Sequence, residues 1–436
     1  MLETRSGAPE RGKWLPRVAA AGLVDKRFGP VLEFSRQRLG GNEPPWFLAT
    51  TAVARHPIGA LHNEVALSSA GTSLSAEEAE SRAIGEAIER YSALNAAASF
   101  ELLFERATLR EGGLADRWPV CAPDEPCSPL FRSLARDVPL TQVRMRRLGD
   151  NASVLAPAGF VFLGFHPLPP EPPVTLPIST GLAFHPERHQ AIWRGLSEVL
   201  ERDAVMTAWW LHRRLPEIDM TDAPYGVTSR LEHLAAAGMT ARLYDITTEL
   251  GVPTAFALLQ SPRYPHLVVG AASRATADAA AAKALDEVVS MRVALQVDAP
   301  TAREPGAAPP ATLVAHARWH AGGNRDGAFD FLLASGLAAI PYRRFAERSI
   351  AEPADMAALD RLAQRFGIEE LPILWVELTA PEMRALGSVV RVVVPGLVPL
   401  SPDDRIRWLG TTRLLRRAGL AAASRGGFAR HPHPFA

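Results

Sequence analysis

The chain has 436 residues, of which 47% are hydrophobic and 22% charged, a composition typical of a folded protein with a substantial core. Its 47 Lys and Arg residues balance its 47 Asp and Glu residues, so no overall charge attracts it to nucleic acid or to a membrane surface. Its two cysteines, in the segment CAPDEPC, are too few for a disulfide framework or a four-cysteine zinc site.

No signal-peptide core occurs near the start of the sequence, and no apolar run reaches the ~18 residues that a membrane span needs. We therefore expect a cytoplasmic protein whose partners include neither nucleic acid nor a membrane.

Apolar runs alternate with long helical patterns along the chain. Ser75 followed by Glu78 is a capping box that opens a helix to about residue 98. Pro186 opens a second helix to about residue 211, and Thr276 caps a third, alanine-rich helix. The strand candidates, rich in β-branched residues, are VLAPAGFVFLGF, AFALLQ, HLVVGAAS and VVRVVVPGLVPL. Clustered prolines at 165–177 and 300–310 exclude regular structure there. The pattern predicts an α+β or mixed α/β fold with an imperfect internal repeat.

Two of the predicted helices share an acidic motif. GEAIERYSAL from position 85 and SEVLERDAVM from position 197 both contain Glu-x-x-Glu-Arg. Residues three apart lie about 60° apart around a helix axis, so each glutamate pair points to one side of its helix. One such motif is typical of a solvated face, whereas two matched motifs favour a shared cleft. The pairs are Glu86 with Glu89 and Glu198 with Glu201.

A cleft lined by these carboxylates requires cations. Asp286 and Glu287 on the third helix add further acidic groups, and like charges raise one another's pKa. Mg²⁺ is a hard cation that binds carboxylates together with phosphate oxygens. Arg90 and Arg202, beside the two pairs, are suited to bind nucleotide phosphate through paired hydrogen bonds. Because no GxxxxGK[ST] loop occurs, an ATP site here is not of the Walker type.

Three long segments resemble, in order, the signature segments of the YcaO-domain proteins: LSAEEAESRAIGEAIERYSAL, PISTGLAFHPERHQAIWRGLSEVLERDAVMTAWW and VVGAASRATADAAAAKALDEVVSMR. GLVDKRFGPV near the start and VVRVVVPGLVPL with LGTTR near the end resemble the azoline-forming cyclodehydratases of that family. The resemblance spans about residues 22 to 436. It implies a YcaO-like α+β fold with mixed sheets, long helices and a non-Walker ATP site between helices.

The resemblance also implies roles for individual residues. It implies that Mg²⁺ is bound among Glu86, Glu89, Glu198 and Glu201, that ATP lies at the same place, and that Glu287 is nearby. The other positions carried over as cofactor-binding are Arg82, Arg90, Gln190 and Arg202. For the domains, it implies an N-terminal extension over 1–45 and a catalytic domain over 46–436 that contains the Pro-rich break and ends in a tail at 431–436.

The tail HPHPFA resembles the Pro-His-Pro-Phe-Pro terminus of azoline-forming members, with Ala436 in place of the final proline. In those proteins the tail reaches the active site. The resemblance therefore implies Pro432, Pro434 and the terminal carboxylate of Ala436 as catalytic elements. Without the resemblance, a Pro-rich end is typical of a disordered terminus.

The sequence departs from the family pattern at four positions. Gly71-Thr72-Ser73 stands where Gly-Lys-Gly is frequent, so a lysine able to bind phosphate is lost at Thr72. Arg82 stands in place of a serine, Gln190 in place of an acidic residue, and Ser290 in place of a glutamine. Either substitutes such as Arg82 complete the site, or nucleotide affinity is weak without a partner protein.

The resemblance implies an ATP-dependent peptide cyclodehydratase. A Cys, Ser or Thr side chain of a ribosomally made precursor peptide attacks the preceding amide carbonyl, ATP phosphorylates the oxygen, and loss of phosphate leaves a thiazoline or oxazoline. Positioning and charge neutralisation carry such chemistry. The implied partners are a precursor peptide rich in Cys, Ser and Thr and an E1/ThiF-like protein that binds its leader, with a flavin dehydrogenase and a homodimer as further candidates.

Two other functions stay open. A non-catalytic paralogue would dock precursor peptide or scaffold a synthetase complex; the missing lysine favours it, and the two complete motifs favour catalysis. A YcaO enzyme that uses sulfide or an amine as nucleophile would form a thioamide or an amidine, and the tail argues against this variant.

Histidines and tryptophans elsewhere form weaker candidates. His185 with His189, and His316 with His320, have the i,i+4 spacing of zinc ligands but lack the glutamate of HExxH, so we expect hydrogen-bonded or exposed histidines. Trp209-Trp210 after the second motif is expected to pack in the core, with a peptide-facing wall as the alternative.

Overall fold

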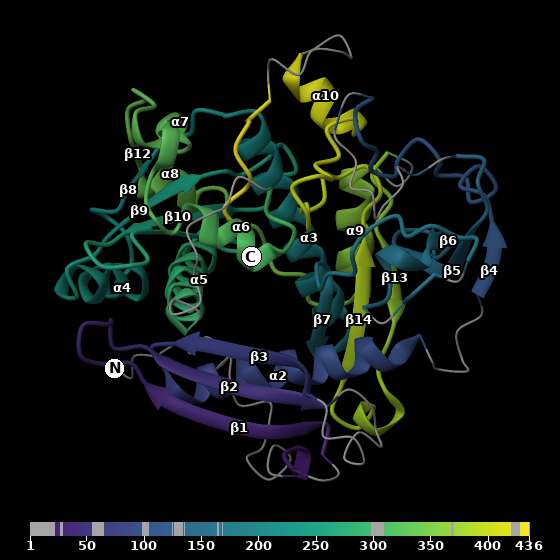
Figure 1. Ribbon diagram of the computed structural model, residues 1–436, viewed down its shortest axis with the longest axis horizontal. Helices are drawn as coiled ribbons and strands as arrows, with labels where there is room; N and C mark the ends of the chain where they lie inside the picture. Colours follow the sequence, from purple (N-terminus) through teal and green to yellow (C-terminus); the bar gives the residue numbers. More distant parts are fainter. Residues whose placement is uncertain are drawn as a thin grey trace, which may run out of the picture.

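The computed structural model describes residues 22–26, 29–54, 65–97, 104–123, 125, 134, 136–163, 165–167, 169–297, 309–367, 370–419 and 428–435. Within these ranges the strands form sheets of three, three, two and six strands, packed with long helices (Figure 1). This arrangement confirms the predicted mixture of helices and sheets. None of the helices in the described ranges is long and apolar enough to cross a membrane.

The first sheet carries the first acidic helix. β1 (Val31–Arg38), β2 (Phe47–Ala54) and β3 (Val65–Ser73) pair antiparallel in that order, and α2 (Ala76–Ala96) packs on them (Figure 1). As predicted, Ser75 caps α2 by accepting a hydrogen bond from the Glu78 amide at 3.4 Å. The capping box is not completed, because the Glu78 carboxylate instead accepts hydrogen bonds from the Ser73 hydroxyl at 2.5 Å and Arg82 at 2.6 Å.

The second sheet carries the second acidic helix. Its strands run in the order β4-β5-β13-β14-β7, with β6 paired to β5. α3 (Arg188–Trp210) packs on β14 and β7. The strands are β4 (Phe104–Ala107), β5 (Leu140–Arg147), β6 (Ser153–Pro157), β7 (Leu182–His185), β13 (Leu374–Glu377) and β14 (Ser388–Val393).

Two predictions about this region need correction. The second helix begins two residues after Pro186, because the backbone of Glu187 is extended and forms the N-cap. The predicted strand VLAPAGFVFLGF is limited to β6, because Pro157 lacks an amide hydrogen and a 3₁₀ turn follows at Ala158–Phe160.

The third sheet carries the third long helix. β11 (Leu267–Ser273), β10 (Thr254–Gln260) and β9 (Thr240–Asp245) pair antiparallel, and α5 (Ala277–Val297) packs on β10 and β11. The Thr276 hydroxyl accepts a hydrogen bond from the Ala279 amide at 3.3 Å, as its predicted capping role requires. The strands predicted from AFALLQ and HLVVGAAS are confirmed as β10 and β11.

The predicted unit of apolar strand, turn and long helix therefore recurs as β3–α2, β7–α3 and β11–α5. Each helix also contacts the next sheet: α2 packs against β7, α3 against β11, and α5 against β3. The three helices consequently face a common centre.

Glycines let each helix approach its strand closely. A Cβ atom on Gly71 would lie 2.1 Å from the Ala79 carbonyl oxygen, and one on Gly270 would lie 2.8 Å from that of Ala284. On α3, a Cβ atom on Gly195 would lie 2.6 Å from the carbonyl oxygen of Gly181. No other residue fits such approaches without movement of the backbone.

The remaining elements surround this centre. One hydrophobic core joins α2, the first sheet and the six-stranded sheet, and another surrounds α5. The other helices and strands are β8 (Ile218–Asp219), α4 (Tyr225–Ala236), α6 (Leu313–His320), α7 (Asp330–Leu333), β12 (Ile340–Pro341), α8 (Tyr342–Ala346), α9 (Met356–Phe366) and α10 (Thr412–Ala418).

Candidate nucleotide site between three helices

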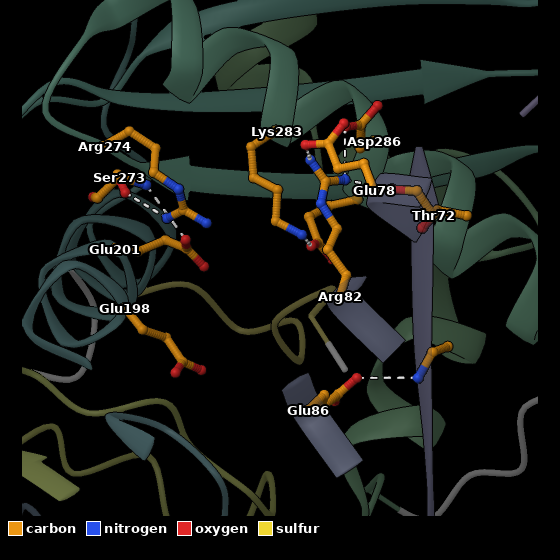
Figure 2. A network of polar contacts seen from close by, with 12 residues as sticks. Thr72, Glu78, Arg82, Glu86, Glu198, Glu201, Ser273, Arg274, Lys283 and Asp286 are labelled. Carbon is orange, nitrogen blue, oxygen red and sulfur yellow. Dashed lines mark hydrogen bonds and ion pairs between the residues drawn. The ribbon is translucent and has the colours of Figure 1, made fainter. Parts of the chain in front are cut away.

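The α2 glutamates lie at the edge of the first sheet. Glu86 accepts a hydrogen bond from the backbone amide of Ala70 on β3 at 3.0 Å and pairs with Arg90 at 2.6 Å (Figure 2). Arg90 also donates to the carbonyl of Ser68. Burial raises the pKa of Glu86, because desolvation outweighs the attraction of Arg90. The first motif is therefore held by its own strand and its own arginine.

The α3 glutamates are held by two different sheets. Glu198 accepts a hydrogen bond from the Gly181 amide before β7 at 3.1 Å, and Glu201 accepts one from the Ser273 amide on β11 at 3.3 Å. Arg202 lies 3.6 Å from both carboxylates. Desolvation raises the pKa of Glu201 to about 7 despite Arg202.

Repulsion joins the two motifs into one site. The pKa of Glu89 is raised well above its usual value, first by desolvation and then by the charges of Glu198 and Glu86. Carboxylates from α2 and α3 therefore share one electrostatic environment, as the sequence predicted. In Figure 2, Glu198 and Glu201 extend from α3, whereas the Glu86 carboxylate on α2 is turned toward the backbone amide of β3 that it binds.

α5 contributes to this region through Glu287, whereas Asp286 belongs to a separate network. Glu287 pairs with Lys283, and although burial opposes it, Lys283 and then Arg82 lower the pKa of Glu287. Asp286 is 1% exposed and accepts hydrogen bonds from Arg82 at 2.8 Å, Arg230 at 2.9 Å and the Trp46 indole at 2.8 Å. Its position is that of a structural anchor between α5, α2 and α4.

Three of the predicted polar contacts are directed elsewhere by neighbouring groups. Besides Asp286, Arg82 binds Glu78 and donates to the carbonyl of Thr72 (Figure 2). Gln190 donates to the carbonyl of Pro353 at 2.9 Å. Arg90 is engaged by Glu86 and Ser68.

Two arginines absent from the sequence-based candidates lie in this region. Arg194 lies on α3 one turn before Glu198, and its pKa is lowered to about 10, first by the surrounding protein and then by the charge of neighbouring Arg274. Arg274 follows β11 and donates to the Ser273 carbonyl (Figure 2). The signal for Arg194 was present in the sequence, since the repeat extends to Arg-x-x-x-Glu-x-x-Glu-Arg in both helices. Arg274 could not be found this way, because only folding brings β11 to α3.

The donor set fits a divalent cation shared with phosphate. Within the described ranges, no three His, Cys, Asp or Glu side chains are grouped closely enough to hold a metal by themselves. Mg²⁺ rarely requires such a cage, because one or two carboxylates with substrate phosphate and water complete its octahedron. The mutually repelling carboxylates at Glu89 suit the cation, and the nearby arginines suit the phosphate.

The C-terminal tail ends beside α3. Pro432 and Pro434 are buried, and the Phe435 ring centroid lies 6.0 Å from the Arg202 guanidinium carbon. Ala436, with the predicted terminal carboxylate, lies outside the described residues. The tail thus reaches the arginine that pairs with both α3 glutamates.

The histidines and tryptophans that the sequence singled out have structural roles. His316 and His320 are buried and bonded to the tail, and Trp209 and Trp210 are buried in the core, as predicted. An apolar cavity of about 70 Å³ lies behind α3, between Val199, Phe160 and Trp408, with Arg202 and Arg391 in its lining.

Comparison with known proteins agrees with these features. Residues 70–398 match the family described as YcaO cyclodehydratase, ATP- and Mg²⁺-binding. An uncharacterized protein from Methanothermobacter thermautotrophicus is 30% identical over 297 residues, 61% of this chain and 67% of that protein.

Solved structures show the same fold at low identity. A heterocyclase in complex with substrate and cofactor superposes with a TM-score of 0.71 at 19% identity, over 95% of this chain and 56% of that one. YcaO from Methanopyrus kandleri bound with AMPPCP and Mg²⁺ gives 0.60 at 20% identity, over 87% and 89% of the two chains. The E. coli microcin synthetase McbBCD complex with pro-MccB17 bound gives 0.57 at 16%, over 92% and 96%. The chain spans just over half the length of the first of these structures.

Proposed function

This chain belongs to the YcaO cyclodehydratase family, whose members bind ATP and Mg²⁺, and from that premise we propose that it is an ATP-dependent cyclodehydratase of peptide backbone amides. The observation that carries the proposal is the shared repulsion of Glu89, Glu198 and Glu86 across α2 and α3. Ionisation of all three carboxylates together is favoured by a bound cation, and the family is described as Mg²⁺-binding.

The residues that would hold the cofactors follow from the donor set. Glu86, Glu89, Glu198 and Glu201 would hold Mg²⁺, and Arg194, Arg274 and Lys283 would face phosphate oxygens. Bound Mg²⁺ would supply charge neutralisation for phosphoryl transfer to an amide oxygen. The backbone amides of Ala70 and Ser273 hold Glu86 and Glu201 in place before any ligand binds.

In the proposed reaction, a Cys, Ser or Thr side chain of the substrate attacks the preceding amide carbon, and ATP phosphorylates the amide oxygen. Loss of that oxygen as phosphate leaves a thiazoline or oxazoline and returns ADP. The chain's task is to orient the amide against the nucleotide and to exclude water. Phe435 beside Arg202 supports a place for the tail, with Pro432, Pro434 and Ala436, next to the reacting groups.

The substrate and partners are part of the proposal. The McbBCD structures are of a synthetase complex, one of them with pro-MccB17 bound. By analogy we propose a ribosomally made precursor peptide as substrate and an E1/ThiF-like protein that binds its leader, with a flavin dehydrogenase or a second copy of the chain as further partners.

One observation favours the scaffold alternative. Arg82, the substitute for the missing lysine, is already bound to Asp286, Glu78 and Thr72. If Arg194, Arg274 and Lys283 do not replace it, the site would lack phosphate-binding cations, and the protein would dock peptide without catalysis. A thioamide- or amidine-forming enzyme would share the nucleotide site but differ in its product.

Calorimetric titration of Mg-ATP into wild type, Glu86→Gln and Glu198→Gln tests the proposal. Glu77→Gln is the matched control, because Glu77 is exposed on the first turn of α2. We expect binding by wild type and control and its loss in both site variants. Incubation with ATP, partner and precursor should then release one water per ring from the peptide, as measured by mass spectrometry.

Each other outcome has a distinct meaning. No binding by wild type with its partner present would make the scaffold function the better account. Binding with a product that gains sulfur or nitrogen would identify the thioamide or amidine reaction. Binding unaffected by Glu86→Gln and Glu198→Gln would remove the nucleotide from this site.

A further inference from the structure

Side-chain donors hold three consecutive carbonyls of the C-terminal segment. The carbonyl of His431 accepts from the Trp209 indole at 3.2 Å, that of Pro432 from Nε2 of His320 at 2.8 Å, and that of His433 from Nδ1 of His316 at 3.2 Å. The C-terminus accordingly lies beside α6 in Figure 1. Tryptophan and histidine rings supply every one of these donors.

The spacing and packing of the two α6 histidines hold their rings toward the tail. Their i,i+4 spacing puts both on one face of α6, whose N-terminus is capped by the Thr312 hydroxyl at 3.2 Å from the Ala315 amide. The His316 ring stacks on His433 with centroids 3.9 Å apart, and His320 meets Trp209 edge-on at 5.4 Å. Packing therefore fixes both ring positions and leaves one nitrogen of each facing the tail.

Hydrogen bonding also fixes which nitrogen carries the proton. A ring nitrogen that faces a carbonyl must be an N–H donor, so His316 is protonated on Nδ1 and His320 on Nε2. The other nitrogens, Nε2 of His316 and Nδ1 of His320, are buried without a hydrogen-bond partner. Both residues are at most 1% exposed, so a second proton would be an unpaired buried charge.

We call Trp209, His316 and His320, which bind the tail carbonyls, the clamp. The clamp determines where the tail meets the candidate site. His433 donates from Nε2 to the carbonyl of Ser401 at 2.6 Å, and its Nδ1 accepts from the Phe435 amide at 3.2 Å. These bonds turn Phe435 onto Phe256, at 5.6 Å, and toward Arg202, at 6.0 Å. A chain of contacts thus runs from α6 through the tail to the arginine of the second acidic motif.

We propose that His316 and His320 are positioning residues that seat the C-terminal segment by donating to its carbonyls in fixed tautomers. Any catalytic consequence rests on the proposed function, because it assumes that the tail acts at the nucleotide site. The seating itself does not depend on that assumption and can be measured alone.

Substitutions that copy one ring nitrogen test the proposal in the full chain. The amide nitrogen of Asn is as many bonds from Cα as Nδ1 of His, and that of Gln as many as Nε2. His316→Asn and His320→Gln keep the required donors, whereas His316→Gln and His320→Asn shift them. The readout is hydrogen exchange of the C-terminal peptide by mass spectrometry, with the α2 peptide as an internal measure of folding.

We expect exchange of the tail amides to be about tenfold faster in the shifted variants than in the matched ones, the effect of losing one net hydrogen bond. The α2 peptide should exchange at the same rate in all four. Equal tail exchange in matched and shifted variants would overturn the proposal.

If the variants fail to fold, a second measurement on the wild-type protein still tests the proposal. In wild type at neutral pH, carboxypeptidase should release the terminal residues slowly, and at a rate set by tail opening; immediate release would overturn the proposal. Mg-ATP titration of the matched variants separates the two hypotheses. If the tail is protected but Mg-ATP does not bind, the proposed function alone is rejected. If Mg-ATP binds but the wild-type tail is unprotected, the role of His316 and His320 alone is rejected.

Discussion

α2 and α3 carry the same nine-residue pattern, Arg-x-x-x-Glu-x-x-Glu-Arg, in different surroundings. On α2 the first arginine, Arg82, is bound by Asp286 and Glu78, and the last, Arg90, closes on Glu86 at 2.6 Å. On α3 the first arginine, Arg194, faces another arginine, and the last, Arg202, lies 3.6 Å from both glutamates.

The difference indicates that the same motif has a structural role on α2 and a ligand-binding role on α3. The α2 arginines are satisfied by acidic and carbonyl partners before any ligand arrives, so they hold the helix in place. On α3, Arg194 lies near the like charge of Arg274, and Arg202 is shared between two carboxylates at a longer distance, so both arginines are better placed to bind an added anion. The motif alone does not assign these roles; the packed neighbours do.

The largest effect should separate the two last arginines. Arg202→Met removes the partner of two partly buried carboxylates, and we expect the free energy of unfolding to fall by about 3 kcal/mol. Arg90→Met should cost about 1 kcal/mol, because Glu86 keeps the Ala70 amide. Urea denaturation at pH 7.5 measures both. Equal losses would remove the distinction between the helices.

The pH dependence of stability should reveal the raised pKa of Glu201. Its pKa is about 7 in the fold against 4.5 in an unfolded chain, so between these values the folded protein binds the extra proton. This contribution to stability is complete below pH 4.5 and lost as pH rises through 7.

Glu201→Gln should therefore stabilise the ligand-free protein by about 3 kcal/mol at pH 8 and by little at pH 4.5. Urea titrations at several pH values measure this. Glu77→Gln, at an exposed position, is the control, and the prediction fails if both variants show the wild-type slope.

Sequence reasoning found what local pattern dictates. The three long helices, the paired glutamates and the buried β10 and β11 follow from capping residues and apolar periodicity. It missed Arg274 and the engagement of Arg82 by Asp286, because these depend on which sheet lies beside which helix. The α6 histidines are hydrogen-bonded, as predicted, but the sequence did not indicate their partner, the tail, because it lies more than 100 residues away.

The first arginines of the two motifs, Arg82 and Arg194, should have opposite effects: Arg194 should matter for nucleotide binding and Arg82 for stability. Arg194→Gln should lower Mg-ATP affinity about tenfold, the loss of one charged contact, without loss of stability, because it also relieves repulsion by Arg274. Arg82→Gln should cost about 1 kcal/mol of stability and leave affinity nearly unchanged, since Asp286 keeps Arg230 and Trp46. Calorimetry and urea denaturation of the same samples give both values. A tenfold affinity loss confined to Arg82→Gln would restore it as the substitute for the missing lysine.

The smallest effect should be at Gln190, a position carried over from the family whose side chain is bound to the Pro353 carbonyl. Its side-chain amide donates to Pro353, so Gln190→Ala removes a contact between α3 and the loop before α9. We expect a loss of about 1 kcal/mol in stability and less than a twofold change in Mg-ATP affinity. Glu198→Gln, two turns along the same helix, provides the contrast, because it should abolish binding while Gln190→Ala spares it. If Gln190→Ala weakens nucleotide binding tenfold, the start of α3 must move on binding, and the ligand would then engage this helix along its whole first half.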